Sequence, residues 1–266
     1  MAGVPLRSVE LDRDRVEDAG GFPFSVPAIR ELPRLELGAV TLLVGENGTG
    51  KSTLLEAVAW AAGLPVTGAA PGAALPEAEV LGRALRLGWR RRSRRGLFLR
   101  AEDFFLHVRA VRREAAGLAA RAEAVRREAA GEHEGERIRR AAPFEGSAQA
   151  LRARYGDDPE ARSHGEQFLD FFKARLVPGG LHLLDEPEAA LSPTSQLALL
   201  ALGRELVAEG AQLVVATHAP VLMAWPDATI LSFDHAPVAP VAWDDIPHVQ
   251  LLRTFLRDPQ AFLRHL

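Results

Sequence analysis

The segment from Gly45 to Ser52 constrains this chain more than any other. It reads Gly-Glu-Asn-Gly-Thr-Gly-Lys-Ser and fills every fixed position of the pattern G-x-x-x-x-G-K-[ST]. Residues 39–44 before it form a short apolar run typical of a buried strand, and residues 52–60 after it are typical of a helix. Glycines at such a junction let backbone N–H groups wrap a phosphate chain at the positive end of the helix. The segment therefore predicts a phosphate-binding loop rather than a chance glycine-rich turn.

The same loop predicts the side chains that bind a nucleotide. Lys51 is expected to reach the β- and γ-phosphates, and the Ser52 hydroxyl to bind Mg²⁺. Lys51 and Lys173 are the only lysines among 32 basic residues, and Asn47 is the only asparagine in the chain. We interpret the presence of Lys51 and Asn47 in the loop as a requirement of its chemistry. The predicted nucleotide contacts are Gly45, Glu46, Asn47, Gly48, Thr49, Gly50, Lys51, Ser52 and Thr53.

The composition sets outer limits on the function. With 266 residues the chain can bury a large core as one α/β domain, here expected to span residues 1–266. It has no cysteine, which excludes disulfides, thiolate metal sites and a cysteine nucleophile. The net charge of −3 gives no global attraction to nucleic acid or to anionic membranes. No signal-peptide pattern and no membrane-spanning apolar stretch is visible, so we expect a cytoplasmic protein without membrane insertion.

Two adjacent carboxylates follow a second apolar segment, residues 181–184. Asp185, at the expected end of this strand, is predicted to bind Mg²⁺, directly or through water. Glu186 points elsewhere and is predicted to polarise the water that attacks the γ-phosphate. An Asp-Glu-Pro sequence alone is more often a turn, but the phosphate-binding loop favours the catalytic interpretation. Because His182 interrupts the apolar run, we expect this strand to be less buried than usual.

Two further segments complete the set of candidate site residues. Ser163, followed by Gly165 and Glu166, opens an expected helix about twenty residues before Asp185. The apolar residues 213–216 lead into Thr217 and His218, which places a histidine just past the end of a strand. Each has a simpler interpretation. Ser163 also fits a helix capping box, and His218 also fits an ordinary loop histidine.

The order of these segments resembles that of the ATP-binding-cassette (ABC) ATPases, specifically their soluble SMC-like and AAA-family relatives. The resemblance covers about residues 26–234. It implies an α/β P-loop NTPase fold of the ABC type, with a mixed sheet, flanking helices and ATP and Mg²⁺ as ligands. It also implies a dimer around ATP, in which Ser163 and Gly165 of one subunit cap the ATP of the other and residues 188–193 contact the partner. By the same resemblance, His218 corresponds to the histidine that contacts the γ-phosphate.

The chain departs from this family at two places. His164 and Glu166 stand where the signature motif has glycine and glutamine. The family's glutamine, which touches metal and attacking water, has no clear counterpart. Residues 96–100 form a candidate strand for that position, and Glu102 follows it. Glu102 either takes the place of the glutamine or is simply an acidic residue in the first turn of the next helix.

A helical insertion is expected at about residues 102–162, between the two halves of the site. Its residues 110–117 recur unchanged as residues 124–131, two heptads later. Such spacing predicts a narrow coiled-coil seam on a charged helix. The seam is expected to pack on its own domain or a dimer mate; contact with nucleic acid or with a partner helix is the alternative. The predicted seam residues are Val111, Ala115, Leu118, Ala122, Val125 and Ala129.

The strongest basic cluster is Trp89 to Arg95, which contains five arginines. It is equally consistent with binding phosphates and stacking on a base, and with a solvated hairpin. The leading functional prediction is an ATP hydrolase that dimerises around ATP and acts on DNA or in a repair, maintenance or defence complex. The first alternative is the nucleotide-binding subunit of an ABC transporter. The second is an ATP-dependent switch that scarcely turns over, which the presence of Glu186 and His218 disfavours.

Overall fold

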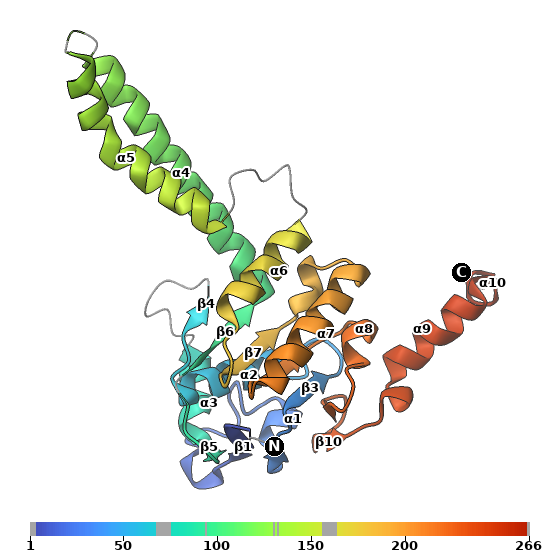
Figure 1. The fold of residues 1–266 in the computed structure, drawn as a ribbon. Helices are drawn as coiled ribbons and strands as arrows, with labels where there is room; N and C mark the ends of the chain where they lie inside the picture. The colour runs from blue at the N-terminus through green and yellow to red at the C-terminus, as the bar shows by residue number, and fades with distance from the viewer. Residues whose placement is uncertain are drawn as a thin grey trace.

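The computed structural model describes residues 4–67, 76–93, 95–129, 131, 133–155 and 164–264. An α/β body carries a long helical hairpin that projects away from it, while two C-terminal helices lie on another side of the body (Figure 1). The mixed sheet, flanking helices and helical insertion confirm the predicted fold class. None of the helices in these ranges is long and apolar enough to cross a membrane.

Within the described ranges, the main sheet has seven strands in the order β10-β9-β3-β8-β7-β6-β4. All its neighbouring pairs are parallel except β10 with β9. The carboxyl ends of β3, β7 and β8 therefore meet at one edge, where ligands bind in open parallel sheets. The strands are β3 (Val40–Val44), β4 (Val66–Thr67), β6 (Gly96–Arg100), β7 (Leu181–Asp185), β8 (Gln212–Ala216), β9 (Thr229–Ser232) and β10 (Ala239–Pro240).

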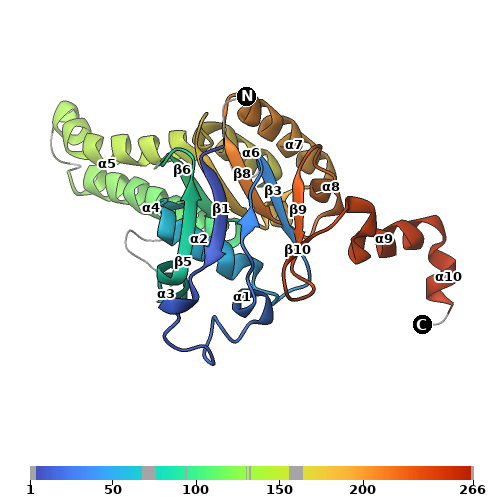
Figure 2. The ribbon, with the colours of Figure 1, turned by 90° about the horizontal axis from the view of Figure 1, so that it is seen from below.

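Helices bury both faces of the main sheet (Figures 1 and 2). On β3, Leu43 belongs to the core that includes α2, whereas Leu42 and Val44 belong to the core that includes α6, α7 and α8. Alternate side chains thus enter opposite cores, which explains the unbroken apolar run in the sequence. The helices of the body are α1 (Pro27–Arg30), α2 (Lys51–Ala62), α3 (Pro76–Ala84), α6 (His164–Arg175), α7 (Pro193–Ala208), α8 (Pro220–Met223), α9 (Pro247–Arg257) and α10 (Pro259–Leu263), with 3₁₀ turns at Arg13–Arg15, Pro187–Ala190 and Trp243–Asp245.

A second, antiparallel sheet has the order β2-β1-β5, formed by β2 (Leu35–Glu36), β1 (Leu6–Leu11) and β5 (Leu85–Trp89). β1 is the central strand of this sheet, because β2 pairs with one of its edges and β5 with the other. The Gln212 side chain joins the two sheets: its amide nitrogen donates to the carbonyl oxygens of Leu6 and Gly38, and its oxygen accepts from the Leu6 N–H.

The expectation that β7 is less buried than usual is wrong. All five of its residues are buried, and His182 is fully buried. The ring Nε2 lies 3.1 Å from the Val177 nitrogen and 3.0 Å from the Val177 oxygen, so the backbone supplies a hydrogen-bond partner for either tautomer. Burial lowers the pKa of His182, which keeps the ring neutral. A neutral, hydrogen-bonded histidine is compatible with a core strand.

The helical hairpin consists of α4 (Ala101–Glu128) and α5 (Glu134–Tyr155). The structure confirms the alanines of the predicted seam: Ala115, Ala122 and Ala129 are buried at heptad spacing. Ala141 and Ala148 of α5 are buried at the same spacing, and α5 is the element that α4 contacts most. The seam therefore packs on the neighbouring helix of the insertion rather than on the body. Leu118 and Val125 are half-buried beside it, and the Val111 side chain lies outside the described residues.

Replacing Ala122 by leucine is expected to loosen the hairpin. Ala122 is 2% exposed, so a larger side chain forces the helices apart at a cost of about 1–3 kcal/mol. Hydrogen exchange of the α5 amides should speed up accordingly. Glu123→Leu introduces the same side chain at the adjacent exposed position and is expected to leave exchange unchanged. Equal exchange rates in both variants would contradict the packing described for the seam.

Candidate nucleotide-binding site

The phosphate-binding loop connects β3 to α2, as the sequence predicts. Gly45, Gly48 and Gly50 have φ angles of 138°, 78° and 101°, which side chains rarely adopt. A Cβ atom on Gly45 would also lie 3.0 Å from Oδ1 of Asp234. The same Asp234 oxygen accepts the Glu46 N–H at 2.8 Å. Asp234, which follows β9, thus fixes the start of the loop, a role that the sequence pattern does not reveal.

Lys51 is buried at the first position of α2. Its ammonium group donates to the carbonyl oxygens of Gly45 at 2.8 Å and Glu46 at 2.7 Å, so the side chain lies across the loop. Burial lowers the pKa of Lys51, and the carboxylates of Glu186 and Asp185 oppose this effect. A cation at a helix N-terminus, surrounded by backbone groups, is well placed to bind a phosphate chain.

Ser52 and Asp185 come together from α2 and β7. The Ser52 hydroxyl donates to Oδ1 of Asp185 at 2.9 Å. Burial raises the pKa of Asp185, while this hydrogen bond and Arg100 lower it. A hydroxyl and a carboxylate are hard oxygen ligands, and Mg²⁺ typically combines one or two of these with phosphate oxygens and water. The two side chains therefore fit the predicted magnesium position beside Lys51.

Arg100 is a member of the site that the sequence interpretation missed. It is the last residue of β6 and stands opposite Asp185 in the parallel register. Its guanidinium pairs with Oδ2 of Asp185 at 3.4 Å and also with the Glu56 carboxylate on α2. Both oxygens of Asp185 are therefore held by neighbouring side chains. Glu102, the candidate for the missing glutamine, falls in the first turn of α4, and its side chain lies outside the described residues.

Glu186 and His218 face each other at the ends of β7 and β8. Glu186 has a φ of 48°, and its N–H donates to the carbonyl oxygen of Ala216. His218 Nε2 lies 3.5 Å from Oε1 of Glu186. Burial, followed by the charge of Lys51, lowers the pKa of His218, so the ring is neutral near pH 7. The Nε2 atom is buried and makes no hydrogen bond among the described residues.

Glu188 holds the segment that carries His218. Its Oε1 accepts the Thr217 hydroxyl at 2.7 Å and the backbone N–H groups of His218 and Ala219. Burial raises the pKa of this carboxylate, and these hydrogen bonds lower it. Glu188 therefore ties the turn after β7 to the turn after β8. The sequence places Glu188 in the expected dimer-contacting segment but gives no sign of this link, because the partners are about thirty residues away.

The structure thus brings together most of the predicted site residues at one edge of the main sheet. Lys51, Ser52, Asp185, Glu186 and His218 all lie at the ends of β3, β7 and β8 or at the start of α2. Ser163 lies outside the described residues, and Gly165 belongs to the first turn of α6. The role of these two residues stays a prediction.

Comparison with known proteins identifies one family match. Residues 31–73 match a family model described as an AAA domain, whereas a search of curated proteins found no match. Among solved structures, the chain is similar to cbiO1 of Clostridium perfringens, part of the ABC transporter complex cbiONQ. That similarity has 17% identity and a TM-score of 0.40, over 88% of this chain and 90% of that one.

Two SMC heads give similar values. The SMC head domain of Thermotoga maritima has 13% identity and a TM-score of 0.44, over 90% of this chain and 100% of that one. An Smc head of Pyrococcus furiosus bound to the C-terminal domain of ScpA has 13% identity and a TM-score of 0.42, over 95% and 99% of the two chains. The AAA-domain match spans the phosphate-binding loop and agrees with the predicted resemblance to the ABC-type and SMC-like P-loop ATPases.

Proposed function

We propose that the chain binds ATP with Mg²⁺ and hydrolyses it between two copies of itself. The observation that carries this proposal is the convergence of Lys51, Ser52, Asp185, Glu186 and His218 at the ends of adjacent parallel strands. Phosphoryl transfer needs a phosphate cradle, a metal position and a group that orients water, and this edge offers all three.

Each side chain has a distinct role in this proposal. Lys51 exchanges its two carbonyl partners for β- and γ-phosphate oxygens. Ser52 and Asp185 would hold Mg²⁺, which when bound would neutralise negative charge on the phosphates. The Glu186 carboxylate accepts a proton from the attacking water. The neutral His218 forms a hydrogen bond to the γ-phosphate through Nε2. Because Nε2 lies 3.5 Å from Oε1 of Glu186, both side chains can act on the same phosphate.

The second copy completes the site in this proposal. Ser163 and Gly165, at and beside the start of α6, are proposed to cap the γ-phosphate bound by the other copy, because a helix N-terminus with a hydroxyl is a good anion receptor. The turn from Glu188 to Pro193 is proposed to contact the partner. Glu188 also holds the His218 segment, so in this proposal it links the contact between copies to the position of His218.

Removal of magnesium tests the basic activity. Phosphate release from ATP by the purified chain should fall to the buffer background in excess EDTA and return when Mg²⁺ is restored, because Ser52 and Asp185 supply only part of a metal coordination shell. Binding of ATP should weaken much less than turnover does, since the loop and Lys51 remain. Phosphate release that is insensitive to EDTA would contradict the assigned metal position.

Truncation of Glu188 tests its positioning role. Glu188→Ala removes the acceptor of three hydrogen bonds from the His218 segment. A misplaced catalytic group costs about 100-fold, so kcat should fall by that order while ATP affinity is retained. Glu188→Gln keeps an acceptor oxygen at the same place and should recover most of the rate. A normal kcat for Glu188→Ala would exclude the positioning role.

A second proposal concerns what the ATPase acts on: nucleic acid, in a repair, maintenance or defence complex. The specific observation is that Arg90, Arg91, Arg92 and Arg95 form no ion pair among the described residues, and all four are exposed. Turnover stimulated by DNA would support this role. Co-purification with a membrane permease would instead favour the transporter alternative.

A further inference from the structure

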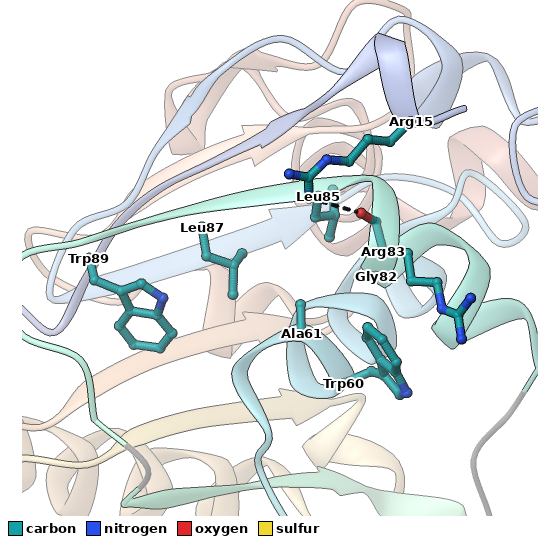
Figure 3. Close-up of a pocket in the computed structure, with 8 residues that line it drawn as sticks. All are labelled: Arg15, Trp60, Ala61, Gly82, Arg83, Leu85, Leu87 and Trp89. Carbon is teal, nitrogen blue, oxygen red and sulfur yellow. Dashed lines mark hydrogen bonds between the residues drawn. The ribbon is translucent and has the colours of Figure 1, made fainter. Parts of the chain in front are cut away.

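A groove on the body lies at the far end of α2 from the phosphate-binding loop. Its volume is about 460 Å³, and α2 runs from Lys51 in the nucleotide site to Ala62 beside the groove. Figure 3 shows its walls, which come from α2 and α3 on one side and β5 on the other. The lining residues are Arg15, Trp60, Ala61, Gly82, Arg83, Leu85, Leu87 and Trp89.

Two indole rings give the groove its character. Trp60 projects from α2 and Trp89 from the end of β5, with Leu87 and Ala61 between them (Figure 3). Trp60 is 38% exposed, although tryptophan is usually well buried. A Cβ on Gly82 would lie 2.5 Å from Trp60 Cε3, so only a glycine in α3 leaves room for this ring position. The glycine costs helix stability of about 1 kcal/mol relative to alanine.

Arginines lie in the lining of this groove and directly after Trp89 in the sequence. Arg15 and Arg83 line it, and each pairs with an acidic neighbour. Arg90 to Arg92 follow Trp89 directly, are exposed, and have no ion-pair partner within the described ranges. The backbone at this point is fixed, because the Arg90 and Arg91 N–H groups donate to the carbonyl oxygen of Pro5. The unpaired guanidinium groups thus begin at a defined position beside Trp89.

We infer that this Trp60–Trp89 groove binds single-stranded nucleic acid. Unpaired bases present aromatic faces that stack on indole rings, and the phosphates between them suit guanidinium groups. A duplex keeps its bases stacked on each other and cannot offer them to Trp60 and Trp89. An acidic peptide matches the charge of the arginines, but its carboxylate side chains do not stack on indole rings. The inference deepens the proposed nucleic-acid role by naming the strand state and the site, and it does not depend on ATP hydrolysis.

Oligonucleotide binding without ATP tests the inference. A labelled oligothymidylate is titrated with the full chain and followed by fluorescence anisotropy. Trp60→Ala and Trp89→Ala should each weaken binding by about 5- to 150-fold. Replacing Arg90, Arg91 and Arg92 by serine should weaken binding and reduce the slope of log K against log salt by about 2. The control replaces three exposed arginines elsewhere, Arg204, Arg257 and Arg264, and should bind as the wild type does.

The outcomes are separable from those of the proposed ATPase. ATP binding measured on each variant shows that the fold is intact, and Trp60→Phe keeps a stacking face where Trp60→Ala does not. Four results would each overturn the inference. The wild type fails to bind the oligothymidylate, or the tryptophan variants bind it as tightly as the wild type does. Alternatively, the wild type binds duplex more tightly than single strands, or binds polyglutamate as tightly as the oligothymidylate. Loss of phosphate release with binding intact would instead count only against the ATPase proposal.

Discussion

Glu186→Gln is expected to lower the rate of ATP hydrolysis by about 10²- to 10⁴-fold, the usual contribution of a general base. Glutamine has the same shape as glutamate but cannot accept the proton of the attacking water. Glu186 is partly exposed at the end of β7 and lies 3.5 Å from His218, so the substitution leaves Lys51, Ser52 and Asp185 in place. ATP affinity should therefore stay within a few-fold of the wild type.

Single-turnover phosphate release with enzyme in excess measures this effect without interference from product release. Glu209→Gln makes the same chemical change at an exposed position after α7 and serves as the matched control. If Glu186→Gln retains most of the rate, another residue activates the water, and the assignment of the two carboxylates fails.

Lys51→Ala is expected to weaken ATP binding by about 100-fold, because two charge-assisted hydrogen bonds to phosphate are lost. The ammonium is buried among the backbone oxygens of the loop, where it lies within the predicted phosphate-binding segment. Isothermal titration with a slowly hydrolysed ATP analogue measures the affinity directly. Turnover at saturating ATP should also fall, since Lys51 touches the transferred group.

The chain provides its own control for this experiment. Lys173 is the only other lysine and lies exposed on α6. Lys173→Ala removes the same charge and side chain from the protein without touching the loop, so its ATP affinity should equal that of the wild type. Equal losses in both variants would mean that the effect of Lys51 is only one of net charge.

The sequence predicts the parts of the site that are encoded locally. The strand, glycines, lysine and helix of the phosphate-binding loop are contiguous, and β7 and β8 are short apolar runs that end in Asp185 and in Thr217 and His218. The parallel sheet then brings these ends together. The sequence does not predict the roles of Arg100 and Glu188, because these depend on contacts between segments that are distant in the chain. Arg100 reaches Asp185 only because β6 and β7 align these two residues, and Glu188 reaches the His218 segment across two turns.

Contacts between distant segments explain features of the fold that the sequence pattern does not indicate. A histidine in an apolar run suggests a strand that is less buried than usual, but the Val177 backbone pairs with Nε2 of His182 inside the core. The alternation in β1 gives no information on its neighbours, and β5, which makes β1 central, is separated from it by more than seventy residues. On the hairpin, the repeat in α4 is plain in the sequence. Its partner stripe on α5 is harder to recognise, because Pro143 interrupts that segment.

The central claim is that two copies of the chain share each ATP, and the mass of the Glu186→Gln variant tests it most directly. Light scattering coupled to size-exclusion chromatography should give the mass of one chain, 28.8 kDa, without nucleotide, and twice that mass with ATP and Mg²⁺. Adding Ser163→Arg to the variant should return it to one chain, because a bulky side chain cannot cap the γ-phosphate of the other copy. A Glu186→Gln variant that binds ATP and stays at 28.8 kDa would contradict the shared site.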